Sequence, residues 1–260
     1  MKVSIITVTY NSEDFLEEAM QSVASQTYKN IEYIVVDGAS TDNTLKIIGE
    51  YHKEGVISKF VSEPDEGIYD AMNKGLKIAS GDVIGFLNSD DFYINESVIE
   101  DVVHSFSDSE CDICYGDVVF VSRRNPQKII RYWKAGEYSK KRLQHGWQIP
   151  HPALFVKKDL VDKTGRYDLS YEIAGDYDYM IKNLLAAKKV TYLPKPLVAM
   201  RWGGKSTSSV SNMIKGNREI HSILRKYNLQ PPSFPIFLLI RFSARFLQVM
   251  EGLMWEQKKH

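Results

Sequence analysis

Short apolar runs alternate with longer amphipathic stretches along the first 95 residues, and this alternation limits the folds open to the chain. The runs SIITV, IEYIVV, ISKFV and DVIGFL have the length and composition of buried strands. Apolar side chains recur at three- and four-residue spacing between them, which predicts helices over residues 12–25, 42–53 and 67–79. Ser12 is the expected cap of the first helix. Strands and helices in this order predict an α/β fold with a mostly parallel sheet.

The pattern becomes less regular after residue 95. It predicts a helix over 96–105, a strand over 113–121, a helix over 177–187 and a following strand at VTYL. The segment PLVAMRWGGKSTSS, residues 196–209, is rich in glycine and serine and predicts a mobile loop. The last fifty residues have a helical pattern that prolines interrupt. We expect them to form a helical extension.

The charge balance and the cysteine content exclude several classes of protein. The chain has 33 Lys and Arg against 33 Asp and Glu, so no net field favours nucleic acid, and we expect no nucleic-acid partner. The two cysteines, Cys111 and Cys114, lie in an apolar run and are expected to be buried thiols in a reducing compartment. The N-terminus lacks a signal-peptide pattern, which predicts a cytoplasmic protein.

Two adjacent acids follow the buried run DVIGFL. Asp90 and Asp91 stand in NSDD, at the carboxyl end of a predicted parallel strand, where α/β sheets bind ligands. Carboxylate oxygens suit a hard cation that bridges phosphates, so Mn²⁺ or Mg²⁺ would fit. The alternative is that the two acids only stabilise the following turn.

Two long stretches carry a family resemblance. VSIITVTYNSEDFLEEAMQSVASQTYKNIEYIVVDGASTDNT and DEGIYDAMNKGLKIASGDVIGFLNSDD are similar to the nucleotide-binding half of family 2 glycosyltransferases. The match spans residues 2–95, and a weaker continuation reaches about residue 205. It implies a GT-A, Rossmann-like fold. The catalytic domain would then cover 1–205, with 1–95 binding the nucleotide sugar and 96–205 forming the acceptor and catalytic half, and the helical extension would cover 206–260.

The resemblance also implies a nucleotide pocket. Carried onto matching positions, Thr7, Thr9, Tyr10 and Asn11 would line the pocket after the first strand. Asp37, in VVDGAST, would accept a hydrogen bond from the base or the ribose, although a turn-capping aspartate is the alternative. In the same way Asp70 and Asn73, in GIYDAMNKG, would lie close to the nucleotide.

The resemblance assigns different roles to the acids of the two halves. Asp91 would be the direct metal ligand, and Asp90 would lie nearer the ribose or the donor sugar. Inversion requires a base that takes the proton of the acceptor hydroxyl. Asp176, in AGDYDYMIKNLL, matches the family's base motif, in which Gly175 replaces the more usual first acid. Helix N-capping is the alternative for Asp176.

Three further residues would contact the donor diphosphate. His151, in IPHPALFV, would bind the pyrophosphate or the metal, with a structural histidine as the alternative. Arg201 and Lys205 flank a stretch that resembles the loop closing over the diphosphate in this family. An ordinary solvated loop is the alternative there.

The terminal segment, residues 236–254, would present a wide apolar face as a helix. Charged residues interrupt it, so it is a poor membrane-spanning segment. It would instead lie on a membrane surface, pack on its own domain or form a homodimer. A peripheral position on the inner face of the cell membrane would suit a lipid-linked acceptor.

Taken together, the residues and the resemblance predict an enzyme. It would be an inverting, metal-assisted glycosyltransferase that moves a sugar from a nucleotide-diphosphate sugar, with UDP favoured, to a hydroxyl of a saccharide or lipid-linked saccharide during cell-surface polysaccharide synthesis. The alternative is an inactive nucleotide-sugar or carbohydrate-binding protein of the same fold. A dinucleotide-dependent oxidoreductase is excluded because TVTYNSED contains no G-x-G-x-x-G.

Overall fold

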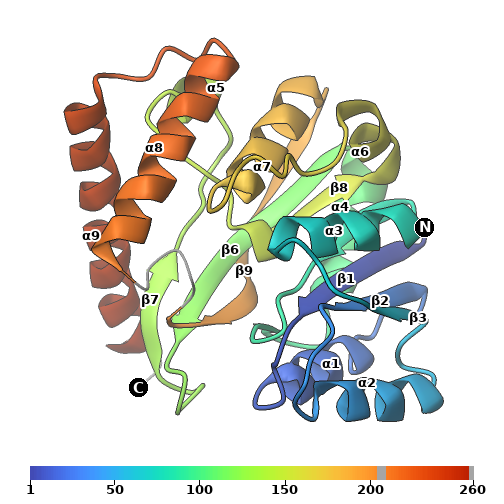
Figure 1. The fold of residues 1–260 in the computed structure, drawn as a ribbon. Helices are drawn as coiled ribbons and strands as arrows, with labels where there is room; N and C mark the ends of the chain where they lie inside the picture. The colour runs from blue at the N-terminus through green and yellow to red at the C-terminus, as the bar shows by residue number, and fades with distance from the viewer. Residues whose placement is uncertain (204–208, 258–260) are drawn as a thin grey trace.

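The computed structural model describes residues 1–203 and 209–257. Within this part of the chain one sheet runs through the molecule in the order β3-β2-β1-β4-β8-β6-β9-β5, and β7 pairs with β6 outside this path. Helices cover both faces of the sheet (Figure 1). The prediction of an α/β fold is confirmed.

The first half is a parallel sheet, as predicted. Its strands are β1 (Val3–Thr9), β2 (Ile31–Asp37), β3 (Lys59–Ser62) and β4 (Val83–Phe86). The helices α1 (Leu16–Ala24) and α2 (Thr44–Lys53) cover one face, and α3 (Ile68–Ile78) covers the other (Figure 1). Because side chains alternate along a strand, Ile5 packs with the α1 and α2 face while Ile6 and Val8 pack with the α3 face.

The second half adds strands of both directions. In chain order the elements are β5 (Phe92–Tyr93), α4 (Val98–Ser109), β6 (Ile113–Val121), β7 (Ile129–Trp133), α5 (Lys140–Leu143), η1 (His151–Ala153), β8 (Leu154–Lys157), α6 (Lys158–Thr164), α7 (Gly175–Ala186) and β9 (Val190–Arg201). β8 pairs antiparallel with β4 and β6, whereas β9 runs parallel to β6. Cys111 and Cys114 are buried free thiols, as expected.

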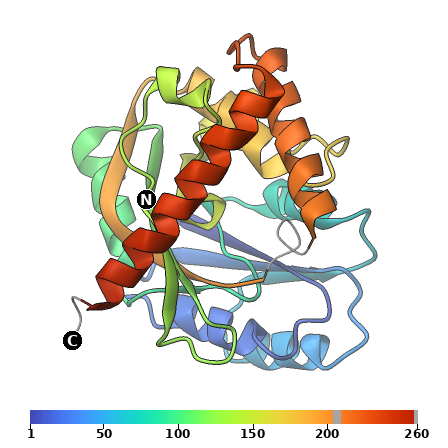
Figure 2. The same ribbon diagram turned by 90° about the vertical axis from the view of Figure 1, so that its left-hand side faces the viewer.

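Two helices end the chain. α8 (Val210–Lys226) packs on α7, and α9 (Phe234–Gln257) crosses β7 (Figure 2). Phe237 of α9 is fully buried between His221 and Gly146. None of the helices in the described part of the chain combines the length and hydropathy of a membrane-spanning segment. The functional division of the chain at residues 95 and 205 stays a prediction.

Two local predictions are wrong. Ser12 does not cap α1 with its side chain: the helix begins at Leu16, and the Ser12 carbonyl accepts the backbone N–H of Leu16 instead. Residues 196–201 are not a loop, because β9 continues to Arg201 in register with Val121 of β6. The segment contains the continuous apolar run Leu197 to Met200, of which Leu197, Val198 and Ala199 are buried in the sheet before the glycines begin.

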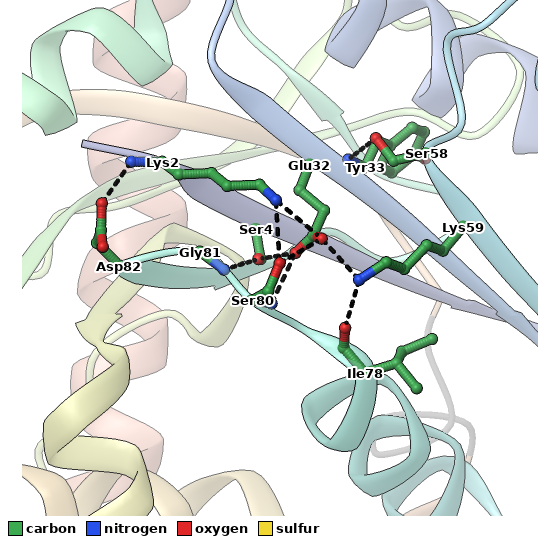
Figure 3. A network of polar contacts seen from close by, with 10 residues as sticks. All are labelled: Lys2, Ser4, Glu32, Tyr33, Ser58, Lys59, Ile78, Ser80, Gly81 and Asp82. Carbon is green, nitrogen blue, oxygen red and sulfur yellow. Dashed lines mark hydrogen bonds and ion pairs between the residues drawn. The ribbon is translucent and has the colours of Figure 1, made fainter.

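A buried carboxylate joins three strands at the amino edge of the sheet. Glu32 of β2 accepts hydrogen bonds from the Ser4 hydroxyl (2.6 Å), from the backbone and side chain of Ser80 (both 2.7 Å) and from the Lys59 ammonium group (2.8 Å) (Figure 3). Burial opposes ionisation, but the hydrogen bonds from Lys59, Ser4 and Ser80 outweigh it and hold the pKa of Glu32 well below its ordinary value.

Replacing this carboxylate should destabilise the fold. We expect Glu32→Gln to lower the free energy of unfolding by about 2 kcal/mol at pH 7, the scale of hydrogen bonds to a charged group. Because the pKa is lowered in the folded state, this contribution is present above the ordinary value of 4.5 and is lost as the pH falls below it. Urea unfolding at pH 7 and pH 3 measures both effects, with Glu50→Gln on the exposed face of α2 as the control. Equal stability of wild type and Glu32→Gln at pH 7 would contradict this account.

Candidate active site

A cleft of about 670 Å³ opens where β1 and β4 end. The carboxyl ends of parallel strands are the usual binding edge of an α/β sheet. The cleft is lined by Val8 and residues 88–91 on one side, and elsewhere by residues 145–148, His151, Pro152, Asp176 and α9 side chains between Ile240 and Gln248. Asp91 and Asp176, which lie in the predicted nucleotide-sugar half and the predicted catalytic half, therefore line the same cleft.

Asp91 is buried, with 1% of its surface exposed. One carboxylate oxygen accepts the Asn88 side-chain amide (2.7 Å) and the other accepts the backbone N–H of Arg201 (3.2 Å). Burial, followed by the negative charge of Asp90, raises the pKa of Asp91 well above its ordinary value. Asp90 pairs with Arg123 at 3.4 Å, whereas Asp91 has no ion-pair partner in the part of the chain that the structure describes. The hard oxygen donors of the two side chains fit a divalent cation. Among the described residues, no group of three or more Asp, Glu, His or Cys side chains lies close enough together to hold a metal ion.

Arg201 lies beneath this pair. Its guanidinium group donates to the Asp90 carbonyl (2.6 Å), pairs with Glu18 and lies over the rings of Phe15 and Phe92. The guanidinium group is buried and engaged with the protein, but Arg201 also lines the cleft, so its predicted contact with the donor diphosphate stays a prediction. The contacts of Arg201 with Asp90 and Asp91 hold the end of β9 against the acidic turn. Lys205 lies outside the described residues.

Asp176 occupies the first turn of α7. Its carboxylate accepts the backbone N–H of Tyr177 (2.8 Å), and the helix N-cap is Ala174 rather than Asp176. Burial raises the pKa of Asp176 to about 6, although the Tyr177 N–H and the charge of Arg241 act against the rise. Asp178, two residues on, points away from the cleft and pairs with Lys226 at 2.9 Å. Of the two acids, only Asp176 lines the cleft.

His151 sits in the cleft wall with its ring among Phe86, Tyr167 and Tyr179. Its Nε2 atom is 2.6 Å from the Tyr167 hydroxyl. Burial lowers the pKa of His151 to about 4, so the imidazole is neutral at physiological pH. The Tyr167 hydroxyl thus fixes the orientation of the His151 ring. The predicted contacts of His151 with pyrophosphate or metal stay predictions.

The residues predicted around the nucleoside divide into two groups. Tyr10 is 62% exposed beside Gly38, and the Asn11 side chain accepts the backbone N–H of Thr41 (2.9 Å) at the same strand end. Asp37 is buried, and its oxygens accept from Ser40 and Ser62, which is the turn-holding role. Its contact with a nucleotide stays a prediction.

The two threonines face the core. Thr7 is fully buried with its hydroxyl 3.0 Å from that of Tyr33, so the prediction that it lines the pocket is wrong. Val8 lines the cleft, and strand alternation turns both neighbours of Val8 to the other face. Thr9, at the end of β1, is buried too, but its hydroxyl has no hydrogen-bond partner in the described structure, and its nucleotide contact stays a prediction.

The Asn73 side chain is engaged with the protein, and its predicted position close to the nucleotide stays a prediction. Its amide donates to the Tyr167 carbonyl (3.0 Å) and accepts the Tyr167 N–H (2.9 Å), which ties α3 to the segment before α7. Asp70 bonds the backbone N–H of Glu66 (3.2 Å) and lies 3.4 Å from Lys74. Its nucleotide contact stays a prediction.

Sequence reasoning missed one wall of the cleft. Arg131 comes from β7, Arg241, Arg245 and Gln248 come from α9, and Gln148 comes from the loop before η1. The only available signal was the stripe of Arg241, Arg245 and Gln248 along the last helix. The sequence does not show which part of the chain this stripe packs against.

Comparison with known proteins identifies the class. The family model described as "Glycosyl transferase family 2" matches residues 4–159. The chain belongs to this family and is an inverting glycosyltransferase. It is 31% identical over 211 residues to a PGL/p-HBAD biosynthesis glycosyltransferase of Mycobacterium bovis, covering 80% of each chain. It is 29% identical over 226 residues to the Escherichia coli UDP-Glc:alpha-D-GlcNAc-diphosphoundecaprenol beta-1,3-glucosyltransferase WfaP, covering 85% of this chain and 86% of WfaP.

Solved structures confirm the GT-A fold. Residues 1–349 of Staphylococcus aureus TarS, in complex with UDP-GlcNAc, superpose with a TM-score of 0.70 at 22% identity, over 94% of this chain and 73% of that one. The match to a longer TarS chain covers only 39% of it. A mannosyltransferase of Pyrobaculum calidifontis, in complex with GDP-Man and Mn²⁺, superposes with a TM-score of 0.66 at 17% identity, over 94% of this chain and 73% of that one.

Proposed function

We propose that the protein transfers a sugar from a UDP-sugar to a hydroxyl group of a saccharide or lipid-linked saccharide, with metal assistance, in cell-surface polysaccharide synthesis. The observation that carries the proposal is that Asp91 and Asp176 line the same cleft from opposite halves of the chain. WfaP acts on a UDP-sugar and a diphosphoundecaprenol-linked acceptor, and TarS binds UDP-GlcNAc, which supports this donor and acceptor class.

The donor would bind across the ends of β1 and β4. Asp91, with Asp90 beside it, would hold Mn²⁺ or Mg²⁺, which when bound supplies a Lewis acid for the departing diphosphate. The exposed ring of Tyr10 would pack against the nucleoside, with Thr9, Asn11, Asp37 and Asp70 around it. Lys205 would add a cation near the phosphates. The neutral His151 would position this wall of the cleft through Tyr167.

Asp176 would act as the general base. A base that removes a proton from an attacking hydroxyl works best when its pKa lies near the working pH. The raised pKa of Asp176, about 6, meets this requirement while leaving the group ionised at neutral pH. Its place on the first turn of a helix fixes the carboxylate by the Tyr177 N–H.

Substituting Asp176 and substituting Asp91 should impair different steps of the reaction. Asp176→Asn should reduce transfer by roughly 10²- to 10⁴-fold, the usual contribution of a general base, with little change in donor affinity. Asp91→Asn should abolish metal-dependent release of UDP from UDP-Glc or UDP-GlcNAc and weaken donor binding. The control is Asp108→Asn on the exposed end of α4. If the protein only binds nucleotide sugars, the wild type would bind the UDP-sugar but would not release UDP from it.

The pH dependence should report Asp176. Since only the ionised carboxylate accepts a proton, transfer should fall as the pH drops through about 6 and level off above it. The rate profile from pH 4.5 to 8.5 at saturating donor measures this. A profile that stays flat through pH 6, while the protein remains folded, would exclude Asp176 as the base.

The outer face of α9 would place the enzyme on the cytoplasmic face of a membrane. Its exposed apolar side chains are Ile236, Leu239, Phe242, Phe246, Leu247 and Met250. A helix that exposes such a face and buries its polar stripe suits a membrane surface, and a lipid-linked acceptor would be found there. A homodimer formed through the same face is the second candidate.

Removing apolar area from this face should release the protein from vesicles. We expect wild type to co-sediment with phosphatidylglycerol vesicles and Phe246→Ser/Leu247→Ser to bind at least several-fold less. Leu169→Ser, at an exposed leucine far from α9 in sequence, is the control. Unchanged vesicle binding would reject the membrane role, and a wild-type dimer that the double substitution dissociates would favour the homodimer.

A further inference from the structure

Three arginines form one wall of the cleft. Arg131 lies on β7, and Arg241 and Arg245 lie one turn apart on α9, which crosses β7 (Figure 2). Arg131 is only 7% exposed, and its Nε atom has no hydrogen-bond partner in the described structure. Its guanidinium lies over the rings of Phe120 (4.3 Å) and Trp133 (5.2 Å). These rings hold the group in place but leave its donors available.

No carboxylate pairs with this cluster among residues 1–203 and 209–251. The ion pairs of this part of the chain do not include Arg131, Arg241 or Arg245. Arg241 donates to neutral acceptors: the Asn217 side chain (2.6 Å), the Gly146 carbonyl and the Gln148 side chain (3.1 Å). The three arginines therefore have no ion-pair partner in these ranges, and Asp176 acts on Arg241 only through its charge.

The arginines also repel one another. Burial, then the charges of Arg245 and Arg241, lower the pKa of Arg131 to about 9. Burial is also the main cause that lowers the pKa of Arg241 to about 10. Keeping several desolvated cations together costs free energy, which an anion bound between them would recover. A phosphate group matches the donors that a guanidinium presents.

The cluster belongs to the acceptor side of the cleft. Arg241 donates to Gly146 and Gln148, and the hydroxyl of Tyr177, the residue after Asp176, donates to the Trp147 carbonyl in the same loop (3.3 Å). An anion at the cluster would therefore lie on the side of the cleft that carries the base. Phe242 and Phe246 are exposed on the same helix, next in sequence to Arg241 and Arg245.

We propose that Arg131, Arg241 and Arg245 form an anion subsite that binds a phosphate group of the acceptor. The proposal rests on the proposed function and narrows it: the acceptor is a phosphate-linked lipid saccharide, whose phosphate lies beside the sugar that is glycosylated. The lipid would leave the cleft along the exposed apolar face of α9. The donor diphosphate would occupy the acidic turn instead.

Binding of a small lipid diphosphate tests the subsite directly. Calorimetric titration with geranyl diphosphate, in EDTA to prevent metal-mediated binding, should show affinity that the uncharged alcohol geraniol lacks. Arg131→Gln and Arg245→Gln should each weaken geranyl diphosphate binding by roughly tenfold, the scale of a charged hydrogen bond. Arg131→Lys keeps the charge but not the guanidinium fork, so it should bind more tightly than Arg131→Gln and more weakly than wild type. Arg225→Gln, on the exposed face of α8, should change nothing.

A second titration, with UDP and Mn²⁺, separates acceptor from donor. UDP affinity should be unchanged in the Arg131 and Arg245 variants. A parallel loss of UDP affinity would assign the cluster to the donor diphosphate, and unchanged geranyl diphosphate affinity would overturn the subsite. Arginine-dependent binding without any UDP release from a UDP-sugar would instead reject the proposed function and leave the anion subsite standing.

Discussion

The site is arranged around one buried carboxyl group, that of Asp91. An ionised carboxylate loses much of its hydration when buried, and only hydrogen bonds or an opposite charge can offset that cost. Asn88 and the Arg201 backbone offset part of it, while Asp90 adds to it. The site is therefore electrostatically incomplete in a way that favours a cation. The same Arg201 hydrogen bond joins the end of β9 to the turn after β4, so the charge and the fold depend on each other.

Buried carboxyl groups at the two ends of the sheet strands have pKa values shifted in opposite directions. At the amino edge Glu32 accepts hydrogen bonds from Ser4 and Lys59 on the neighbouring strands and from Ser80 in the loop before β4, and its charge stabilises the fold. At the carboxyl edge Asp91 and Asp176 both have raised pKa values because burial is not fully compensated. Functional sites commonly contain ionisable groups with shifted pKa values, and burying these groups lowers the stability of the fold. Interactions elsewhere in the structure must offset that loss. In this protein the Glu32 network is one such set of interactions.

The position of a side chain could be predicted from the sequence when residues nearby in the chain determine it, and not when distant segments do. Asp91 was predictable because a buried strand directly precedes it, and the fold follows from local periodicity in the first 95 residues. Thr7 was misplaced although strand alternation with Val8 would have turned it to the core. The partner of Asn73 lies at Tyr167, and the arginines that line the cleft together with Arg131 lie on α9, so neither arrangement has a local signal. Long-range packing decided these side chains.

An experimental structure with Mn²⁺, a non-transferable UDP-sugar and an acceptor analogue would test the central claim most directly. We predict that the metal lies between Asp91 and the diphosphate, and that the Asp176 carboxylate faces the acceptor hydroxyl on the side of the sugar opposite the UDP. A metal held away from Asp91, or Asp176 on the same side of the sugar as the UDP, would contradict the account.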